Sequence, residues 1–221
     1  MLDSLYFLAL IDRNLKMFEI KATNLSKKFN ERLIFKDIQF ELQSGQSLAI
    51  TGHNGSGKTT LVRIISGLLS PNDGKIEFFS DNHEIAIQEI YSFIGLVGPY
   101  LQLYHNLTAM ENLIFFSKIR GLGANKSRIF DLTKLLGLKG RELDAVKNYS
   151  SGMLQRLKYV FALLHSPKIL LVDEPTSNLD EEGMEVVYSI LNDQMKNNIL
   201  IVATNNPEES KFGQKQIHVG L

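Results

Sequence analysis

Apolar residues either alternate with polar ones or run without interruption in five short segments of the chain. Segments 18–22 and 38–42 alternate with the two-residue period of half-buried strands. Segment 47–51 leads directly into glycines, and segments 169–172 and 199–203 are apolar throughout. Short uninterrupted apolar runs are typical of strands buried on both faces of a parallel sheet. The pattern therefore predicts a strand at each of the five positions.

Between these strands, apolar residues recur with the 3.6-residue period of helices. Helical patterns cover 58–68, 108–136 (with a glycine-rich break after residue 120), 151–165 and 181–196. Alternating strands and helices predict an α/β fold with a mostly parallel core sheet. The block at about 90–165 is mostly helical and could form a lobe of its own.

The first 16 residues lie outside this alternation. Their apolar run, Leu5–Ile11, resembles the core of a signal peptide, but Asp3 stands where positive charge is expected and no small-residue cleavage site follows. We therefore expect 1–16 to be an extension that is disordered or not native, because chain ends often lack structure. The folded domain is expected to occupy 17–221, with Met17 as the natural start.

Composition narrows the classes of partner and site. The 221 residues are 44% hydrophobic and 22% charged, which suits one globular domain. The formal net charge is zero, which argues against a nucleic-acid partner. The absence of cysteine excludes disulfides and thiolate chemistry. No apolar run reaches the roughly 18–20 residues that a membrane-spanning helix needs.

Residues 52–59 match the phosphate-loop pattern G-x-x-x-x-G-K-[ST] and are called the phosphate loop below. Glycines let backbone amides point at phosphate oxygens, and the following helix directs its positive end to the same place. Lys58 would bind the β- and γ-phosphates, and the Thr59 hydroxyl would bind Mg²⁺. A chance match is the alternative, and the flanking strand and helix argue against it. The expected nucleotide-binding residues are Gly52, Asn54, Gly55, Ser56, Gly57, Lys58, Thr59 and Thr60.

Two carboxylates, Asp173 and Glu174, follow the apolar strand at 169–172 and form the acidic strand end. Parallel sheets bind ligands at the carboxyl ends of their strands. Asp173 is placed to hold magnesium, and Glu174 to activate the attacking water as general base. The alternative is a strand that simply ends in a polar turn. Phosphoryl transfer, however, requires carboxylates for the metal and the attacking water beside the phosphate loop, which favours the functional interpretation.

Two further segments resemble motifs of the ABC ATPases. Residues 149–156, YSSGMLQR, are similar to the family's signature L-S-G-G-Q, and residues 173–180, DEPTSNLD, are similar to its Walker B motif and D-loop. The resemblance extends from Met17 to the C-terminus. It implies a P-loop NTPase with a mostly parallel core sheet, an N-terminal antiparallel β part and a helical signature subdomain. It also implies ATP and Mg²⁺ as ligands.

The resemblance assigns further roles by position. In the family, the signature closes over the γ-phosphate held by the other subunit of a head-to-tail dimer, which implies this role for Ser150, Ser151 and Gly152. A serine-capped helix start is itself an anion site, and a simple helix cap is the structural alternative. Asp180 lies in the loop that would communicate between the two sites, and Phe29 stands where the family stacks an aromatic on adenine.

The sequence departs from the family at two positions of the site. Pro99 stands where the family has a magnesium-binding glutamine, and Gln102 either substitutes for it or is only a surface loop residue. Asn205 replaces the switch histidine; its amide can still donate to a γ-phosphate but carries no proton at neutral pH. Hydrolysis is expected to survive because Glu174 is present, but without pH sensitivity from position 205.

ABC ATPases that lack membrane spans usually work with separate transmembrane permease subunits, so the resemblance implies a protein on the cytoplasmic inner face of the cell membrane. A second ATPase subunit, expected to be an identical copy, completes the site. The chain most resembles the haem-exporter ATPases of cytochrome c maturation, among exporter-type subunits. Alternatives are another exporter for drugs, lipids or polysaccharides, a slowly hydrolysing ABC regulator, or a soluble ABC protein. In this family the membrane subunits dock on the helical block near 99–120. Of its apolar residues Phe115, Phe116 and Ile119, we expect at least half to serve core packing instead.

Overall fold

The computed structural model describes residues 17–121, 123 and 125–220. The predicted extension at 1–16 lies outside the described residues. The strands are β1 (Phe18–Phe29), β2 (Arg32–Gln43), β3 (Ser47–Thr51), β4 (Asp73–Ser80), β5 (His83–Ile85), β6 (Ile94–Val97), β7 (Ile169–Asp173), β8 (Ile199–Thr204) and β9 (Lys215–His218). The helices are α2 (Lys58–Ile65), α3 (Ala109–Ile119), α4 (Lys126–Leu135), α5 (Ser151–Leu163), α6 (Glu181–Asn197) and α7 (Pro207–Ser210), with 3₁₀ turns η1 (Ile90–Ser92) and η2 (Val146–Asn148).

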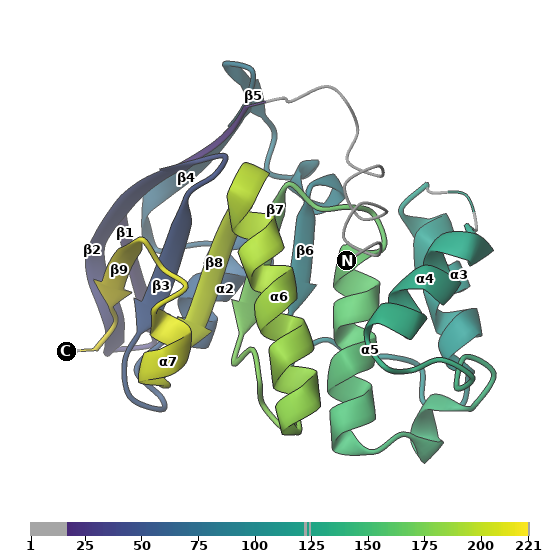
Figure 1. Cartoon of the computed structure of the whole chain (residues 1–221). Helices are drawn as coiled ribbons and strands as arrows, with labels where there is room; N and C mark the ends of the chain where they lie inside the picture. The colour runs from purple at the N-terminus through teal and green to yellow at the C-terminus, as the bar shows by residue number, and fades with distance from the viewer. Residues whose placement is uncertain (1–16, 122, 124, 221) are drawn as a thin grey trace.

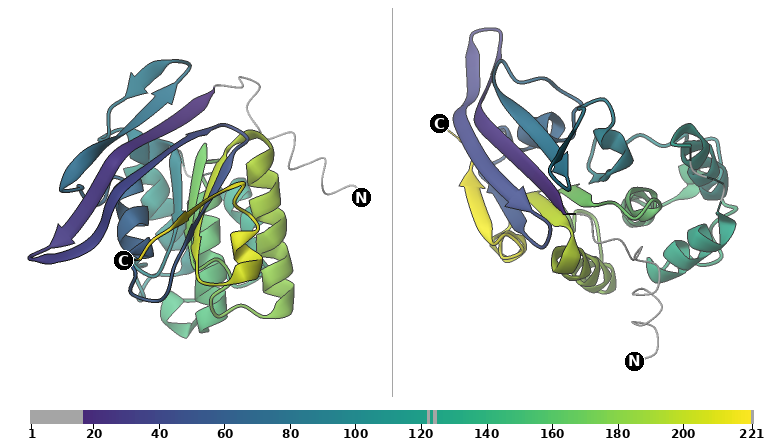
Figure 2. Two further views of the ribbon diagram at one scale, coloured as in Figure 1. Left: turned by 90° about the vertical axis from the view of Figure 1, so that its left-hand side faces the viewer. Right: turned by 90° about the horizontal axis from the view of Figure 1, so that it is seen from above.

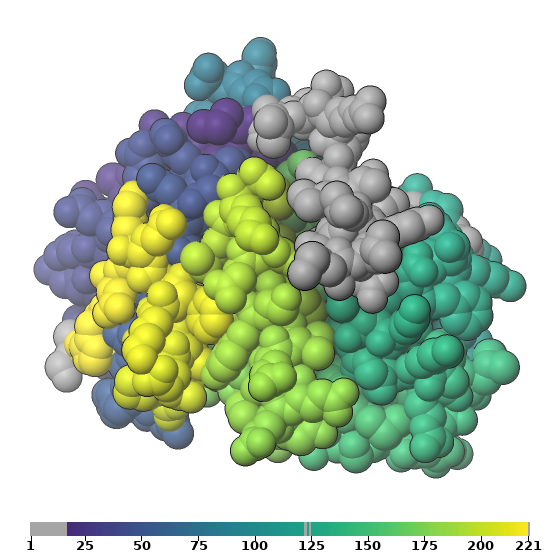
Figure 3. All heavy atoms as spheres, in the orientation of Figure 1, coloured from purple at the N-terminus to yellow at the C-terminus, as the bar shows by residue number. Residues whose placement is uncertain are grey.

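The strands form two sheets. An antiparallel sheet has the order β2-β1-β4-β5, and a parallel sheet has the order β6-β7-β8-β3-β9. The antiparallel sheet covers one side of the molecule, and helices α3 to α6 lie on the opposite side of the parallel sheet (Figures 1 and 2). In the space-filling view, α6 and the C-terminal segment form much of the surface over that sheet (Figure 3). The α/β fold predicted from the sequence is confirmed.

Both faces of the parallel sheet are buried, which explains its uninterrupted apolar strands. Along β7, Ile169 and Leu171 pack with residues of β1 and α2, whereas Leu170 and Val172 pack with residues of α3 to α6. Strand β8 alternates in the same way. Because each such side chain contributes about 1.5–3 kcal/mol on burial, a polar residue at either position would be costly. The two-sided burial fixes β7 and β8 in the middle of the domain.

The predicted strands are confirmed, with differences in length. Strands β1 and β2 are longer than the predicted 18–22 and 38–42. Register shifts interrupt the apolar–polar alternation along them, so the sequence pattern revealed only part of each strand. Asn30 and Glu31 form the turn between them, and Asn30 takes a left-handed φ of 51°, which asparagine tolerates. Strand β9 was not predicted from the sequence, and it pairs parallel with β3.

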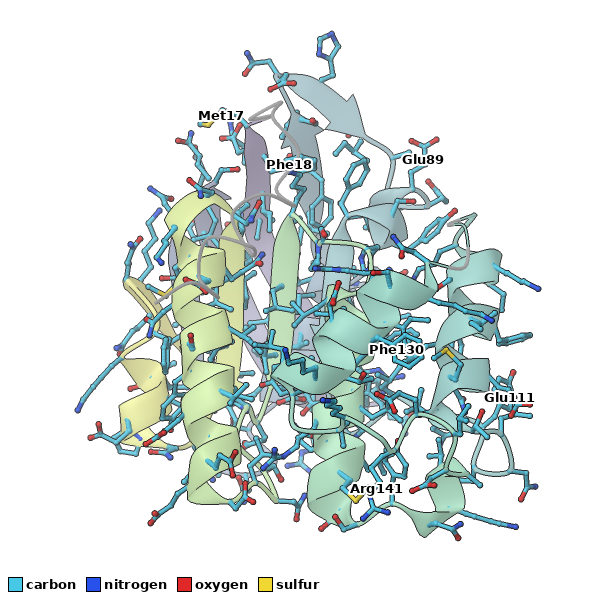
Figure 4. All side chains as sticks on the ribbon, turned by 45° about the vertical axis from the view of Figure 1, so that its right-hand side comes forward. Met17, Phe18, Glu89, Glu111, Phe130 and Arg141 are labelled. Carbon is cyan, nitrogen blue, oxygen red and sulfur yellow. The ribbon has the colours of Figure 1, made fainter. Side chains whose placement is uncertain are left out.

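The block at about 90–165 contains the helices α3, α4 and α5, but it also supplies β6 to the parallel sheet. A mutual capping box between Thr108 and Glu111 begins α3. Figure 4 labels Glu111, Phe130 and Arg141 in this helical part and Phe18 on β1. No helix among the described residues is long and apolar enough to cross a membrane.

Arg120 ties the end of α3 to the sheet. Its guanidinium donates to the carbonyl of Tyr91 at 3.2 Å and lies 2.8 Å from Nε2 and 3.1 Å from Nδ1 of His165. Nε2 of His165 also lies 3.0 Å from the carbonyl of Ile94. A neutral His165 leaves one ring nitrogen able to accept from Arg120, whereas a protonated ring would face the guanidinium with donors only. Burial, with the Arg120 charge as a second cause, lowers the pKa of His165 to about 4.

This cluster predicts a pH-dependent stability. The pKa of His165 is lower in the folded chain than the ordinary value of 6.5, so the unfolded chain takes up the proton first as the pH falls. Between pH 7.5 and pH 5 the free energy of unfolding should lose about 2 kcal/mol from this residue. In urea melts, His165→Gln should lack this component. An equal pH dependence in the variant and the native protein would contradict the assignment.

Candidate functional site

The phosphate loop connects the carboxyl end of β3 to the amino end of α2. Gly52, Gly55 and Gly57 have φ angles of 147°, 80° and 111°, a region that other residues rarely adopt. A Cβ at Gly52 would lie 2.1 Å from the Val219 carbonyl oxygen, and one at Gly57 would lie 2.4 Å from a methyl group of Ile34. The loop therefore needs glycine at positions 52 and 57, both for its backbone conformation and for the close approach of Val219 and Ile34.

Lys58 is buried, and its ammonium group turns back over the loop. It donates to the carbonyls of Gly52 at 2.8 Å and His53 at 3.2 Å. The hydroxyl of Ser56 is buried and has no hydrogen-bond partner among the described residues. A desolvated cation and an unpaired hydroxyl within a glycine loop fit a bound phosphate, whose oxygens would satisfy both.

The phosphate loop meets the acidic strand end directly. The Thr59 hydroxyl donates to Oδ2 of Asp173 at 2.6 Å, although the two residues are 114 positions apart in sequence. Burial raises the pKa of Asp173, and the Thr59 hydrogen bond and the Lys58 charge partly oppose this. A hydroxyl and a buried carboxylate are hard oxygen donors, which fit a magnesium ion.

Glu174 lies beside this pair in a strained backbone conformation. Its φ of 57° is unusual for a residue other than glycine, and such strain clusters at functional sites. Its Oε1 lies 4.0 Å from the Lys58 ammonium, and its side chain is 39% exposed. Burial raises the pKa of Glu174, with an opposing contribution from Lys58. A partly exposed carboxylate with a raised pKa is suited to accept a proton from water.

Asn205 also reaches the phosphate loop. It follows β8, and its amide donates to Oδ1 of Asn54 at 2.9 Å. An open pocket of about 330 Å³ adjoins both the phosphate loop and residues 204–207, called the switch segment below. His53, Asn205 and His218 are part of its lining. The structure thus brings the predicted switch position to the predicted phosphate site.

Glu209, on α7, is a buried residue that sequence reasoning missed. Its carboxylate accepts hydrogen bonds from the hydroxyls of Thr176 and Thr204, so it joins the segment after Glu174 to the segment before Asn205. A glutamate in a short helix carries no sequence signal for this position. Its contacts hold the acidic strand end and the switch segment together.

The signature segment, 149–156, forms the start of α5. Ser150 caps the helix by accepting a hydrogen bond from the Met153 amide at 3.2 Å, and both Ser150 and Ser151 are exposed. A Cβ at Gly152 would lie 2.9 Å from the Asn178 carbonyl oxygen. The helix start is therefore capped and partly exposed, and it packs against the loop at 174–180.

Further contacts tie α5 to the loop at 174–180. Arg156 pairs with Asp180 at 2.5 Å, and the Tyr159 hydroxyl donates to the Pro175 carbonyl at 2.9 Å. None of the hydrogen bonds among residues 17–121, 123 and 125–220 joins residues 150–152 to the phosphate loop. The signature is thus attached to the loop at 174–180 rather than to the phosphate loop of its own chain.

The remaining predicted site residues lie at the periphery. Phe29 ends β1, is 47% exposed, and lies 5.2 Å below the Lys27 ammonium. Thr60 is partly buried in the first turn of α2. Pro99 and Gln102 are exposed in the segment after β6, and no hydrogen bond in the described part of the chain joins Gln102 to Thr59 or Asp173.

Comparisons with known proteins agree with this arrangement. The family model described as ABC transporter matches residues 35–177. The bacitracin transport ATP-binding protein BcrA of Bacillus licheniformis is 33% identical over 202 residues, 91% of this chain and 66% of that protein. The cytochrome c biogenesis ATP-binding export protein CcmA of Vibrio vulnificus is 30% identical over 189 residues, 86% of this chain and 92% of that protein.

A solved dimer of the ATP-binding cassette MJ0796, in a post-hydrolysis state with ADP and Pi, aligns with a TM-score of 0.76. Its sequence is 27% identical, and the alignment covers 91% of this chain and 94% of that one. The chain spans 66% of BcrA and 52% of another similar curated relative. This chain belongs to the ABC transporter family, and its fold is that of the family's ATP-binding and ATP-hydrolysing domain.

Proposed function

We propose that this chain binds ATP with Mg²⁺ and hydrolyses it as the motor subunit of an ABC exporter. The observation that carries the proposal is the 2.6 Å hydrogen bond from Thr59 to Asp173, with Lys58 and Glu174 beside it. This contact joins the phosphate loop to the acidic strand end, and phosphoryl transfer needs both parts.

Each residue of the site has a distinct task. Lys58 would exchange the carbonyls of Gly52 and His53 for phosphate oxygens, while loop amides and the α2 N-terminus bind the same group. Thr59 and Asp173 would hold a magnesium ion, which would supply charge neutralisation at the β- and γ-phosphates. Glu174 takes the proton of the attacking water. Phe29 is exposed on the β1–β2 hairpin and free to stack on adenine.

A second copy of the chain would complete the site. The exposed Ser150 and Ser151 and the half-buried Gly152 offer backbone amides at a helix start. No hydrogen bond among the described residues joins them to the phosphate loop of their own chain. The dimeric MJ0796 structure, with its ADP and Pi, supports this assignment. ATP held across such an interface favours the closed dimer, and hydrolysis removes that preference. Asp180, paired with Arg156, links the signature to the loop at 174–180 of its own chain.

Membrane partners are proposed from family membership and from the surface of α3. Phe115 is 39% and Ile119 is 63% exposed, whereas Phe116 packs against Phe161 with ring centroids 4.9 Å apart. The first two leave an apolar surface that transmembrane permease subunits would cover, and Phe116 belongs to the core. The chain would then lie on the cytoplasmic inner face of the cell membrane.

The cargo is proposed from the relatives. Haem or cytochrome c biogenesis is the finer candidate, supported by similarity to CcmA along 92% of that protein. Export of a peptide antibiotic is the second candidate, supported by the similarity to the bacitracin transport protein. Deletion of the gene in its source organism separates the two. The haem candidate predicts loss of haem-containing c-type cytochromes with unchanged bacitracin resistance; the reverse result would favour the second.

Hydrolysis is tested by turnover of the purified chain with Mg·ATP. Glu174→Gln should lower turnover by about 10²-fold or more, since it removes the general base, and should retain ATP binding.

Asn205→His should introduce a pH dependence of turnover near pH 6.5 that the native asparagine does not provide.

Unchanged turnover in Glu174→Gln would show that the base lies elsewhere. A native chain that binds Mg·ATP but turns it over no faster than the Glu174→Gln variant would favour the regulator alternative over a motor.

A further inference from the structure

The segment that follows β6 contains a buried hydroxyl without a hydrogen-bond partner at residues 17–121, 123 and 125–220. Pro99 stands at the position of the family's magnesium-binding glutamine and offers no side-chain oxygen. The next residue, Tyr100, places its hydroxyl in the interior, where no described residue hydrogen bonds with it. An unpaired buried hydroxyl costs about 1–3 kcal/mol, so its presence calls for a partner that arrives with a ligand.

The sheet register places this segment beside the proposed magnesium site. Val97, the last residue of β6, pairs with Val172 of β7. The strands are parallel, so the chain leaves β6 level with Asp173, and Tyr100 follows three residues after Val97. Burial raises the pKa of Tyr100, with the Asp173 charge as a second cause and the Arg63 charge opposing it.

Two contacts fix the ring of Tyr100. A Cβ at Gly98 would lie 2.7 Å from Cζ and 2.9 Å from the hydroxyl of Tyr100, so this close approach requires glycine. The Arg63 guanidinium lies over the same ring, 5.9 Å from its centroid. Arg63 belongs to α2, one turn after the magnesium candidate Thr59. The ring therefore contacts both the end of β6 and α2, the helix that follows the phosphate loop.

We propose that the Tyr100 hydroxyl takes the position left vacant by Pro99 and hydrogen bonds with the water shell of a magnesium ion held by Thr59 and Asp173. Tyr100 is then a positioning residue for the metal. This inference rests on the proposed function, because it presupposes that the site binds a metal–nucleotide complex. It also gives the exposed Gln102 no part in metal binding.

The test compares Tyr100→Phe with Tyr104→Phe. Tyr104 lies in the same segment, is 52% exposed and packs on Phe115 rather than on the phosphate site. Mn²⁺ binding to the ADP-loaded chain is followed by electron paramagnetic resonance, and ADP binding in EDTA by calorimetry. Tyr100→Phe should weaken Mn²⁺ binding about tenfold, the effect of one hydrogen bond near a charged group. ADP affinity in EDTA should not change, and Tyr104→Phe should match the native chain in both.

A melting curve separates positioning from a structural role. Since no residue in the described part of the chain hydrogen bonds with the hydroxyl, Tyr100→Phe should melt no lower than the native protein. Unchanged Mn²⁺ affinity in Tyr100→Phe, or a loss found in Gln102→Ala instead, would overturn the inference and leave the proposed function standing. A native chain whose nucleotide binding is indifferent to Mn²⁺ would overturn both.

Discussion

The hydrogen bond between Thr59 and Asp173 joins the two halves of the site, and the rest of the fold makes it possible. Thr59 lies in the first turn of α2, which follows β3 and the phosphate loop, and Asp173 ends β7, with β8 between the two strands in the sheet. The strands are parallel, so their carboxyl ends share one edge, toward which the arrowhead of β8 points at the bottom of Figure 1. Packing on both faces of β7 and β8 holds that edge in register, so that a hydroxyl and a carboxylate from distant parts of the chain meet at 2.6 Å.

The same edge carries the contacts that would transmit hydrolysis. Glu174 is followed by a loop that packs on α5 through Pro175 and Asp180, and on α7 through Thr176 and Glu209. These direct contacts connect Glu174 to the signature helix and to the switch segment, so a movement of the Glu174 backbone on hydrolysis would be passed to both. In the proposed dimer, the signature moved by one site would be the segment that covers the nucleotide of the other.

Sequence reasoning predicted the parts of the site that reside in local patterns. The phosphate loop, the strand before Asp173 and the helix start at Ser150 each follow from glycine spacing, apolar runs and capping chemistry within about ten residues. Contacts between distant segments were not predictable in this way. Glu209 looks like any surface glutamate until α7 packs on β8, and Tyr100 looks like a loop aromatic until the β6–β7 register brings it level with Asp173. Strand β9 was missed because its sequence is mostly polar, since it lies at the sheet edge.

The central claim is that this chain holds ATP in its own phosphate loop and covers it with the signature of a second copy. The most direct measurement is the mass in solution of the Glu174→Gln chain, by light scattering, with Mg·ATP and with Mg·ADP. The account predicts dimers with ATP and monomers with ADP, and a return to monomers in ATP when Ser150 is also replaced by a bulky, uncapped residue such as phenylalanine. Monomers under every condition, or dimers that do not depend on the nucleotide or on Ser150, would contradict it.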